Sequence, residues 1–111
     1  MKKSDNIVFK IKADFLRVLA HPARLQIIES LKKGETSVGK LAEALGMEQS
    51  NLSRHLGALR GLGILSARQE KKNVYYYLSK HEIFEVLRPI AELLNKKLRT
   101  SEKILKSLTE D

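Results

Sequence analysis

The sequence has no cysteine and no tryptophan, and aromatic residues make up only 5% of its 111 residues. The absence of cysteine excludes disulfide bonds, thiolate metal sites and thiol-based redox sensing. It also suits a reducing compartment, and we expect a cytoplasmic protein. Because aromatic side chains are scarce, leucine and isoleucine must fill most of the core of what the length predicts to be one domain, residues 1–111.

Long apolar runs and enzyme motifs are missing as well. No stretch approaches the roughly 18 apolar residues that a transmembrane helix needs, and Lys12 and Asp14 interrupt the N-terminal apolar segment, which argues against a signal peptide. There is no Gly-rich phosphate loop and no nucleophile motif. The histidines, His21, His55 and His81, are not spaced as metal ligands. We therefore expect no membrane partner, no enzymatic activity, no cofactor and no metal site.

Positive charge is what the sequence has in excess. Its 21 Lys and Arg residues outnumber 13 acidic residues and give a formal net charge of +8. Such an excess favours an anionic partner, with nucleic acid ahead of membrane headgroups. A basic protein that is merely soluble is the alternative.

Residues 47–62 are the most informative segment, because they predict a helix with two different faces. At 3.6 residues per turn, Leu52, Leu56 and Leu59 share one side, which must be buried. The opposite side is small and polar and carries one long cation, Arg54. A merely solvated face would be richer in Glu and Lys, so this pattern is typical of a helix that enters the major groove of DNA.

A shorter helix precedes this one and completes a helix-turn-helix over about residues 37–62. Thr36 or Ser37 can cap the shorter helix and Gly46 can end it. Helical spacing predicts a further helix over about residues 7–20. The side chains of the helix-turn-helix expected to contact DNA bases or phosphates are Gln49, Ser50, Asn51, Ser53, Arg54 and His55.

The apolar period then changes from 3.6 to 2, which predicts a β-hairpin over about residues 64–78. A charged hairpin after a helix-turn-helix is a wing, and its turn residue Asn73 is expected to adopt positive φ. Tyrosines 75–77 are expected to pack in the core rather than stack on bases. A hairpin tip kept soluble by its charge is the alternative to a DNA contact. The wing cations expected to contact DNA are Arg68, Lys71 and Lys72.

The terminal helices carry more apolar surface than one small domain can bury. Ser79 and Glu82 predict a capping box at the start of a long helix over about residues 80–108, in which Pro89 is expected to cause a kink or a restart. A helix folded back on its own core is the alternative to pairing with a second copy, which we expect. The expected dimer-interface residues are Val8, Ile11, Phe15, Leu87, Leu94, Leu98 and Leu105.

Three motifs within residues 10–95 carry a family resemblance. They are Leu19-Ala20-His21-Pro22-Ala23-Arg24-Leu25, Gln49-Ser50-x-x-Ser53-x-His55-Leu56-x-x-Leu59 and Val74-Tyr75-Tyr76-x-Leu78. In combination they resemble the ArsR/SmtB family of dimeric winged helix-turn-helix repressors. The resemblance implies an operator-binding homodimer built on the first and last helices.

The sequence departs from this family where many members bind metals. Ser37 and Gly39 stand where a cysteine motif would be, and a second common metal site would fall on Lys80, Glu82, Leu93 and Lys96. A lysine and a leucine cannot hold that cation, so the resemblance implies a member without either metal site. Two further departures are Glu48, in place of a hydroxyl helix cap, and Lys71, where a turn glycine is common.

The sequence therefore predicts a mainly α, α+β chain with a small β-hairpin: a winged helix-turn-helix with long N- and C-terminal helices for dimerisation. The expected function is sequence-specific binding of double-stranded DNA at a near-palindromic operator, as a homodimeric transcriptional repressor without a metal-sensing site. Two alternatives stay open, a protein–protein assembly module and a regulator gated by a small organic effector at the dimer interface. The sequence does not identify such an effector.

Overall fold

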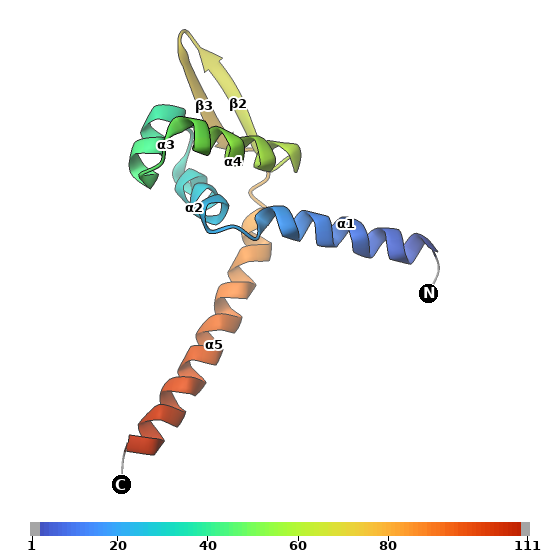
Figure 1. The fold of residues 1–111 in the computed structure, drawn as a ribbon, viewed down its shortest axis with the longest axis vertical. Helices are drawn as coiled ribbons and strands as arrows, with labels where there is room; N and C mark the ends of the chain where they lie inside the picture. Colours follow the sequence, from blue (N-terminus) through green and yellow to red (C-terminus); the bar gives the residue numbers. More distant parts are fainter. Residues whose placement is uncertain (1–2, 110–111) are drawn as a thin grey trace. The chain divides into compact units, whose positions relative to one another are not determined.

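The computed structural model of the protein describes residues 3–109 (Figure 1). The chain consists of two compact units, one within residues 1–81 and the other within residues 82–111. In the described part of the chain, the first unit holds four α-helices and a small sheet, and the second holds one long helix. The mainly α fold with a small β component is thus confirmed.

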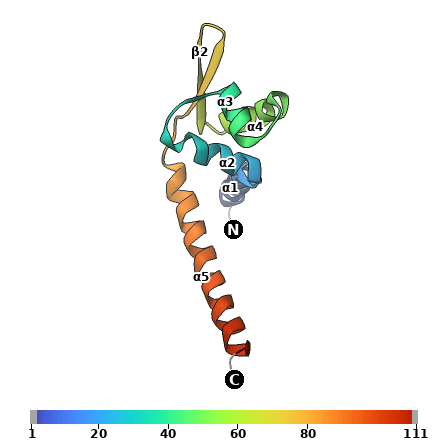
Figure 2. The ribbon, with the colours of Figure 1, turned by 90° about the vertical axis from the view of Figure 1, so that its left-hand side faces the viewer.

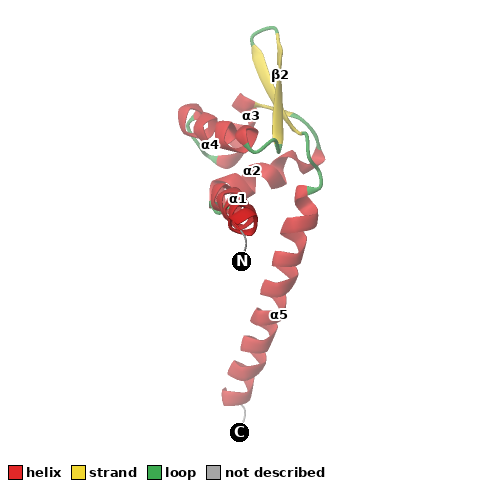
Figure 3. Ribbon diagram, turned by 90° about the vertical axis from the view of Figure 1, so that its right-hand side faces the viewer, coloured by secondary structure: helices red, strands yellow, loops and turns green. Residues whose placement is uncertain are grey.

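The first unit contains four α-helices in its described part. They are α1 (Lys3–Leu19), α2 (Pro22–Ser30), α3 (Val38–Leu45) and α4 (Gln49–Gly61), with a 3₁₀ turn, η1 (Leu31–Lys33), after α2. The strands are β1 (Thr36–Ser37), β2 (Leu65–Glu70) and β3 (Asn73–Leu78), and Figure 3 shows them in yellow beside the red helices. Helix α1 begins earlier than the expected residue 7, and Asp5 lies in its first turn, where a negative charge is favourable.

The helix-turn-helix consists of α3 and α4, and both ends of α3 form as expected. The Ser37 hydroxyl accepts a hydrogen bond from the Lys40 backbone N–H and so caps its start. Gly46 ends it in the left-handed conformation, with φ of 64°, which glycine adopts without steric cost. The chain therefore turns sharply into α4.

The core of the first unit lies beneath α4. Leu52, Leu56 and Leu59 are fully buried on one side of this helix, as the leucine spacing predicted. They pack in a core that also includes the fully buried side chains of Ile27, Ile28, Leu31 and Leu41. Because this side is anchored, the opposite face of α4 is held toward solvent.

The sheet has three antiparallel strands in the order β1-β3-β2. Strand β1 was not expected, and its two residues pair with Tyr76 and Tyr75 of β3. Strands β2 and β3 form the wing. The expectation of positive φ at Asn73 was wrong, because Asn73 pairs with Glu70 in the ladder and the positive φ, 56°, falls on Lys71 in the turn.

The second unit is formed in its described part by α5 (Ile83–Thr109) (Figure 2). The helix continues through Pro89 without a restart. The expected capping box was wrong, because the helix begins only at Ile83. The Ser79 hydroxyl instead donates a hydrogen bond of 2.9 Å to the carbonyl oxygen of Gly63, which fixes the end of the wing.

Candidate nucleic-acid interface

The outer face of α4 is small, polar and accessible. Ser50, Arg54 and Gly57 are exposed on it, opposite the fully buried leucines. The Arg54 guanidinium donates a hydrogen bond of 2.6 Å from Nη2 to Oδ1 of Asn51, one helical turn earlier. Ser50, Asn51 and Arg54 line a shallow open depression. The Asn51 carboxamide thus orients the Arg54 guanidinium at the surface, where a planar fork can meet a base edge or a phosphate.

Two other expected contact residues flank this face. Ser53 is exposed on α4. Gln49 is exposed at the first position of α4, and its Nε2 lies 3.8 Å from where a Cβ on Gly39 of α3 would stand. The Gln49 side chain therefore lies beside α3, at the edge of the outer face.

The start of α4 lacks a side-chain cap. Glu48 occupies the N-cap position in an extended conformation, and its carboxylate makes no capping hydrogen bond. The first N–H groups of α4 therefore have no side-chain acceptor there. The same N–H groups and the positive end of the helix dipole can attract a phosphate, whereas the Glu48 carboxylate repels it.

Replacing this residue by a better cap is expected to affect both stability and DNA affinity. We predict that the free energy of unfolding of Glu48→Ser exceeds that of Glu48→Gln by about 0.5–1 kcal/mol, because both lose the carboxylate at the positive end of the helix dipole and only serine is a good acceptor for an N–H in the first turn. Removal of the negative charge should also strengthen binding to DNA. The control is Glu48→Gln, which removes the same charge without a good cap and should improve affinity without the gain in stability. Urea denaturation and fluorescence anisotropy measure the two effects, and equal stability of both variants would contradict the capping account.

His55 was expected to contact DNA, but the structure buries its side chain. Its side chain is only 5% exposed and points into the domain, away from the outer face of α4. Its Nδ1 accepts a hydrogen bond of 3.1 Å from Nε of Arg24, and its ring lies 4.4 Å from the ring of His21. Arg24 also donates from Nη1 to the carbonyl oxygen of Val18. The three side chains of His21, Arg24 and His55 therefore join α4 to α2 and to the end of α1.

The environment of His55 favours its neutral form. Burial lowers the pKa of the imidazole, and the electrostatic effect of His21, Arg24 and Arg54 lowers it further. A neutral ring can also accept the Arg24 hydrogen bond at Nδ1, which an imidazolium cannot. His21 itself has a structural role at the start of α2, where its Nδ1 accepts from the N–H of Ala23.

These contacts predict an acid-sensitive fold. The pKa of His55 is lower in the folded chain than in the unfolded one, so the unfolded state binds more protons and is favoured as the pH falls. The contribution of His55 to the free energy of unfolding should be fully present above the ordinary histidine pKa of about 6.5. Below that pH, the free energy of unfolding should decrease by at most about 1.4 kcal/mol per pH unit. The measurement is urea denaturation between pH 5 and 8. His55→Gln should flatten this dependence, whereas His81→Gln, at an exposed histidine, should not; the same slope in all three proteins would contradict the assignment.

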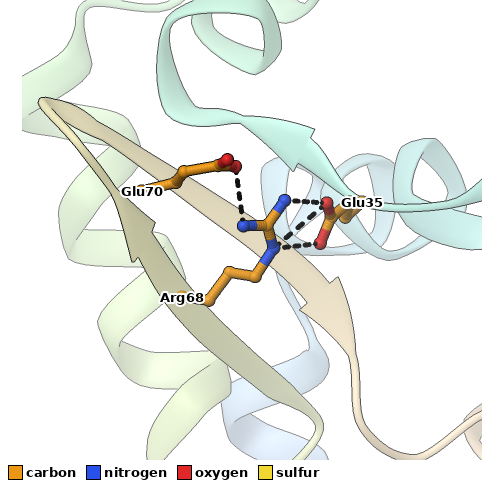
Figure 4. A network of polar contacts seen from close by, with 3 residues as sticks. All are labelled: Glu35, Arg68 and Glu70. Atoms are coloured by element: carbon orange, nitrogen blue, oxygen red, sulfur yellow. Dashed lines mark hydrogen bonds and ion pairs between the residues drawn. The ribbon is translucent and has the colours of Figure 1, made fainter.

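The wing residues differ in how they are placed. Lys71 and Lys72 are exposed at the tip of the β2–β3 hairpin. Arg68, which was expected to contact DNA, is already paired, because its guanidinium donates to the carboxylates of Glu35 and Glu70 (Figure 4). Sequence reasoning missed Glu35 and Glu70, since no local pattern connects residues so far apart in the chain as Glu35 and Arg68.

The expected dimer residues lie on apolar surfaces within each unit. On α1, Val8 is 47% and Ile11 62% exposed, while Phe15 is half-buried. On α5, exposed leucines recur along the helix, while Leu87 is half-buried. The exposed ones among the expected residues are Leu94, Leu98 and Leu105.

Two further observations concern metals and membranes. Within residues 3–109, no group of three or more His, Asp or Glu side chains is arranged to hold a metal ion. Among the helices of this described part, none is long and apolar enough to cross a membrane.

Comparison with known proteins gives consistent matches. Residues 21–67 match the model of the bacterial regulatory protein family arsR. An HTH-type transcriptional regulator of Mycobacterium tuberculosis is 37% identical over 102 residues, which cover 91% of this chain and 90% of that protein. The crystal structure of NolR from Sinorhizobium fredii has a TM-score of 0.77 at 35% identity, over 84% of this chain and 93% of that one. A homodimeric winged helix-turn-helix DNA-binding domain from Mycobacterium bovis has a TM-score of 0.76 at 26% identity, over 90% and 93% of the two chains.

Proposed function

This chain belongs to the ArsR family of bacterial helix-turn-helix transcriptional regulators, and we propose that it acts as a homodimeric repressor on a near-palindromic operator. The observation that carries this proposal is the outer face of α4. That face is exposed, small and polar, and it bears an oriented arginine. We place the protein in the cytoplasm, where its DNA target lies.

In the proposed complex, α4 enters the major groove. Arg54 pairs with O6 and N7 of a guanine, while Gln49 and Asn51 can pair with N6 and N7 of an adenine. The hydroxyls of Ser50 and Ser53 are short enough to bond phosphates or bases at close approach. Gly57 keeps the outer face thin at the point where the helix leaves the groove. The wing lysines, Lys71 and Lys72, contact flanking phosphates and contribute affinity without sequence information.

A homodimer is supported by the apolar surfaces of α1 and α5 and by the relative from Mycobacterium bovis, which is described as homodimeric. Two-fold symmetry would place two α4 helices about one DNA turn apart, roughly 34 Å. A dimer of this kind covers a near-palindromic site. Repression follows if the dimer occupies DNA that the polymerase needs.

Neither alternative function gains a specific observation. Assembly surfaces use buried aromatic and aliphatic anchors, whereas the described outer face of α4 has none. Gating by a small organic effector would be an addition to DNA binding rather than a replacement. A thermal-shift screen would detect an effector, because a ligand at 100 times its Kd adds about 2.7 kcal/mol.

Selection of bound duplexes from a random pool tests the proposed operator. We expect the selected sequences to converge on a near-palindrome whose half-sites are about 10 base pairs apart from centre to centre. Selection of a single unrepeated half-site would contradict the symmetric dimer. Failure to enrich any double-stranded sequence would contradict the function itself.

A further inference from the structure

We propose that Arg68 is a positioning residue that holds the wing in place through Glu35 and Glu70, and that it is not a ligand for DNA phosphate. The proposal concerns how the first unit presents Lys71 and Lys72. Its consequence for DNA rests on the proposed function, in which these lysines contact phosphates. Its consequence for the free protein does not.

Arg68 forms ion pairs with two carboxylates, those of Glu35 and Glu70. Nε of Arg68 donates to Oε2 of Glu35 at 2.9 Å, and Nη2 donates to Oε1 of the same carboxylate. Nη1 donates to Oε2 of Glu70 at 2.9 Å. The Glu35 contact is a two-point fork, which fixes both the direction and the rotation of the guanidinium. Figure 4 shows the guanidinium between the two carboxylates.

Arg68 and Glu35 come from opposite sides of the middle strand of the sheet, β3. Arg68 of β2 is paired with Tyr75 of β3, and Tyr75 is paired with Ser37 of β1. The Arg68 guanidinium carbon lies 4.7 Å from the centre of the Tyr75 ring. Glu35 precedes β1 by one residue. Arg68 therefore crosses the middle strand and connects the outer strand of the wing to the segment that leads into α3.

Few backbone pairs connect the wing to strand β1. The base of the hairpin is anchored by the buried Leu65 and Leu78 and by the Ser79–Gly63 hydrogen bond. Strand β1, however, has only two residues and pairs with β3 at two positions, so the β1–β3 ladder by itself adds little. A two-stranded hairpin is marginally stable in water by itself. The two hydrogen bonds from Arg68 to the Glu35 carboxylate add a connection between β2 and the segment before β1 that does not depend on backbone pairing.

The cluster of Arg68, Glu35 and Glu70 has more negative than positive groups. Arg68 with Glu35 and Glu70 carries a formal charge of −1, which does not attract a phosphate. Hydrogen bonds from Arg68 lower the pKa of the Glu35 carboxyl, so this group stays ionised at neutral pH. The cations that the wing itself offers to DNA are then Lys71 and Lys72 at its tip, and the cluster serves to place them.

The variant Glu35→Gln separates the two roles, because they predict opposite results. If Arg68 bound phosphate, releasing it from Glu35 and removing a negative charge would strengthen DNA binding. If Arg68 positions the wing, the variant should bind operator DNA more weakly, by about threefold to tenfold. The log–log salt slope of binding should also become less negative, by about one to two, because lysine–phosphate contacts are lost. The control is Glu29→Gln, which makes the same charge change on α2, at a side chain 68% exposed.

Three further measurements complete the test. Amide hydrogen exchange of the free protein should become faster in β2 and β3 in Glu35→Gln and should not change in Glu29→Gln. Arg68→Lys, which keeps the charge but cannot form the fork, should behave like Glu35→Gln. In a Lys71→Ala/Lys72→Ala background, Glu35→Gln should cost little further affinity, because the contacts it displaces are already gone.

Either of two results overturns the proposal: Glu35→Gln binds DNA at least as tightly as Glu29→Gln, or its wing exchanges no faster than that of the wild type. If the wild type binds no DNA, the proposed function fails. The exchange measurement still decides whether Arg68 holds the wing.

Discussion

We expect Arg54→Ala to weaken operator binding by about 1–3 kcal/mol for each half-site, because the arginine pairs with two acceptor atoms of one guanine. The loss should be specific to sequence. Discrimination at one base pair of each half-site should relax, while binding to unrelated DNA falls much less. The structure supports this expectation, because Arg54 is exposed and is oriented by a hydrogen bond of 2.6 Å from its Nη2 to Oδ1 of Asn51. Fluorescence anisotropy with operator and scrambled duplexes measures the difference.

The matched control is Arg60→Ala, which removes the same side chain from the same helix. Arg60 is exposed in the last turn of α4. At about 100° per residue it lies about 120° around the helix from Arg54. Its loss should reduce the affinity for operator and scrambled DNA alike. Equal discrimination by wild type and Arg54→Ala would remove Arg54 from the base contacts.

Leu98→Asp is expected to dissociate the dimer and, with it, tight operator binding. Leu98 is 60% exposed on α5, and the proposed pairing would bury it. An unpaired carboxylate in an apolar interface costs about 3 kcal/mol or more, and two-fold symmetry places one in each protomer. Because the two half-sites are then no longer bound together, affinity should fall by about 100-fold or more. Analytical ultracentrifugation measures the dimer, and anisotropy the binding.

Thr100→Asp is the control for this prediction. It introduces the same charge two positions further along α5, about 200° around the helix from Leu98. Its exposed hydroxyl donates to the carbonyl of Lys96 in the same helix. The dimer should survive in this variant. A Leu98→Asp protein that sediments as a dimer would contradict the assignment of this face.

The fold could be predicted where the chain repeats a period. The leucine spacing identified the buried side of α4, because it reflects burial on one face. The change to a period of two identified the wing, although burial along β2 and β3 does not alternate. Strand β1 could not be found, since two residues carry no period of their own. The start of α5 was misplaced because Ser79 found a tertiary partner, the Gly63 carbonyl, instead of a helix N–H.

The candidate site was predicted in the same uneven way. The exposed positions of Ser50 and Arg54 follow from the helical wheel. The contacts of His55 and Arg68 depend on partners more than 30 positions earlier in the sequence, Arg24 and Glu35. Nothing in the local sequence shows that a polar residue beside the outer face is turned inward, or that a wing cation is already neutralised. Tertiary contacts decide both.

Binding of double-stranded DNA by α4 and the wing can be measured in a salt titration. Anisotropy is measured with duplex DNA from upstream of the protein's own gene, between about 50 and 200 mM salt. We expect binding at low salt and a log–log slope of about −3 or steeper, because each lysine–phosphate contact contributes about −0.9. Absence of binding to any double-stranded DNA at low salt would contradict the proposed function.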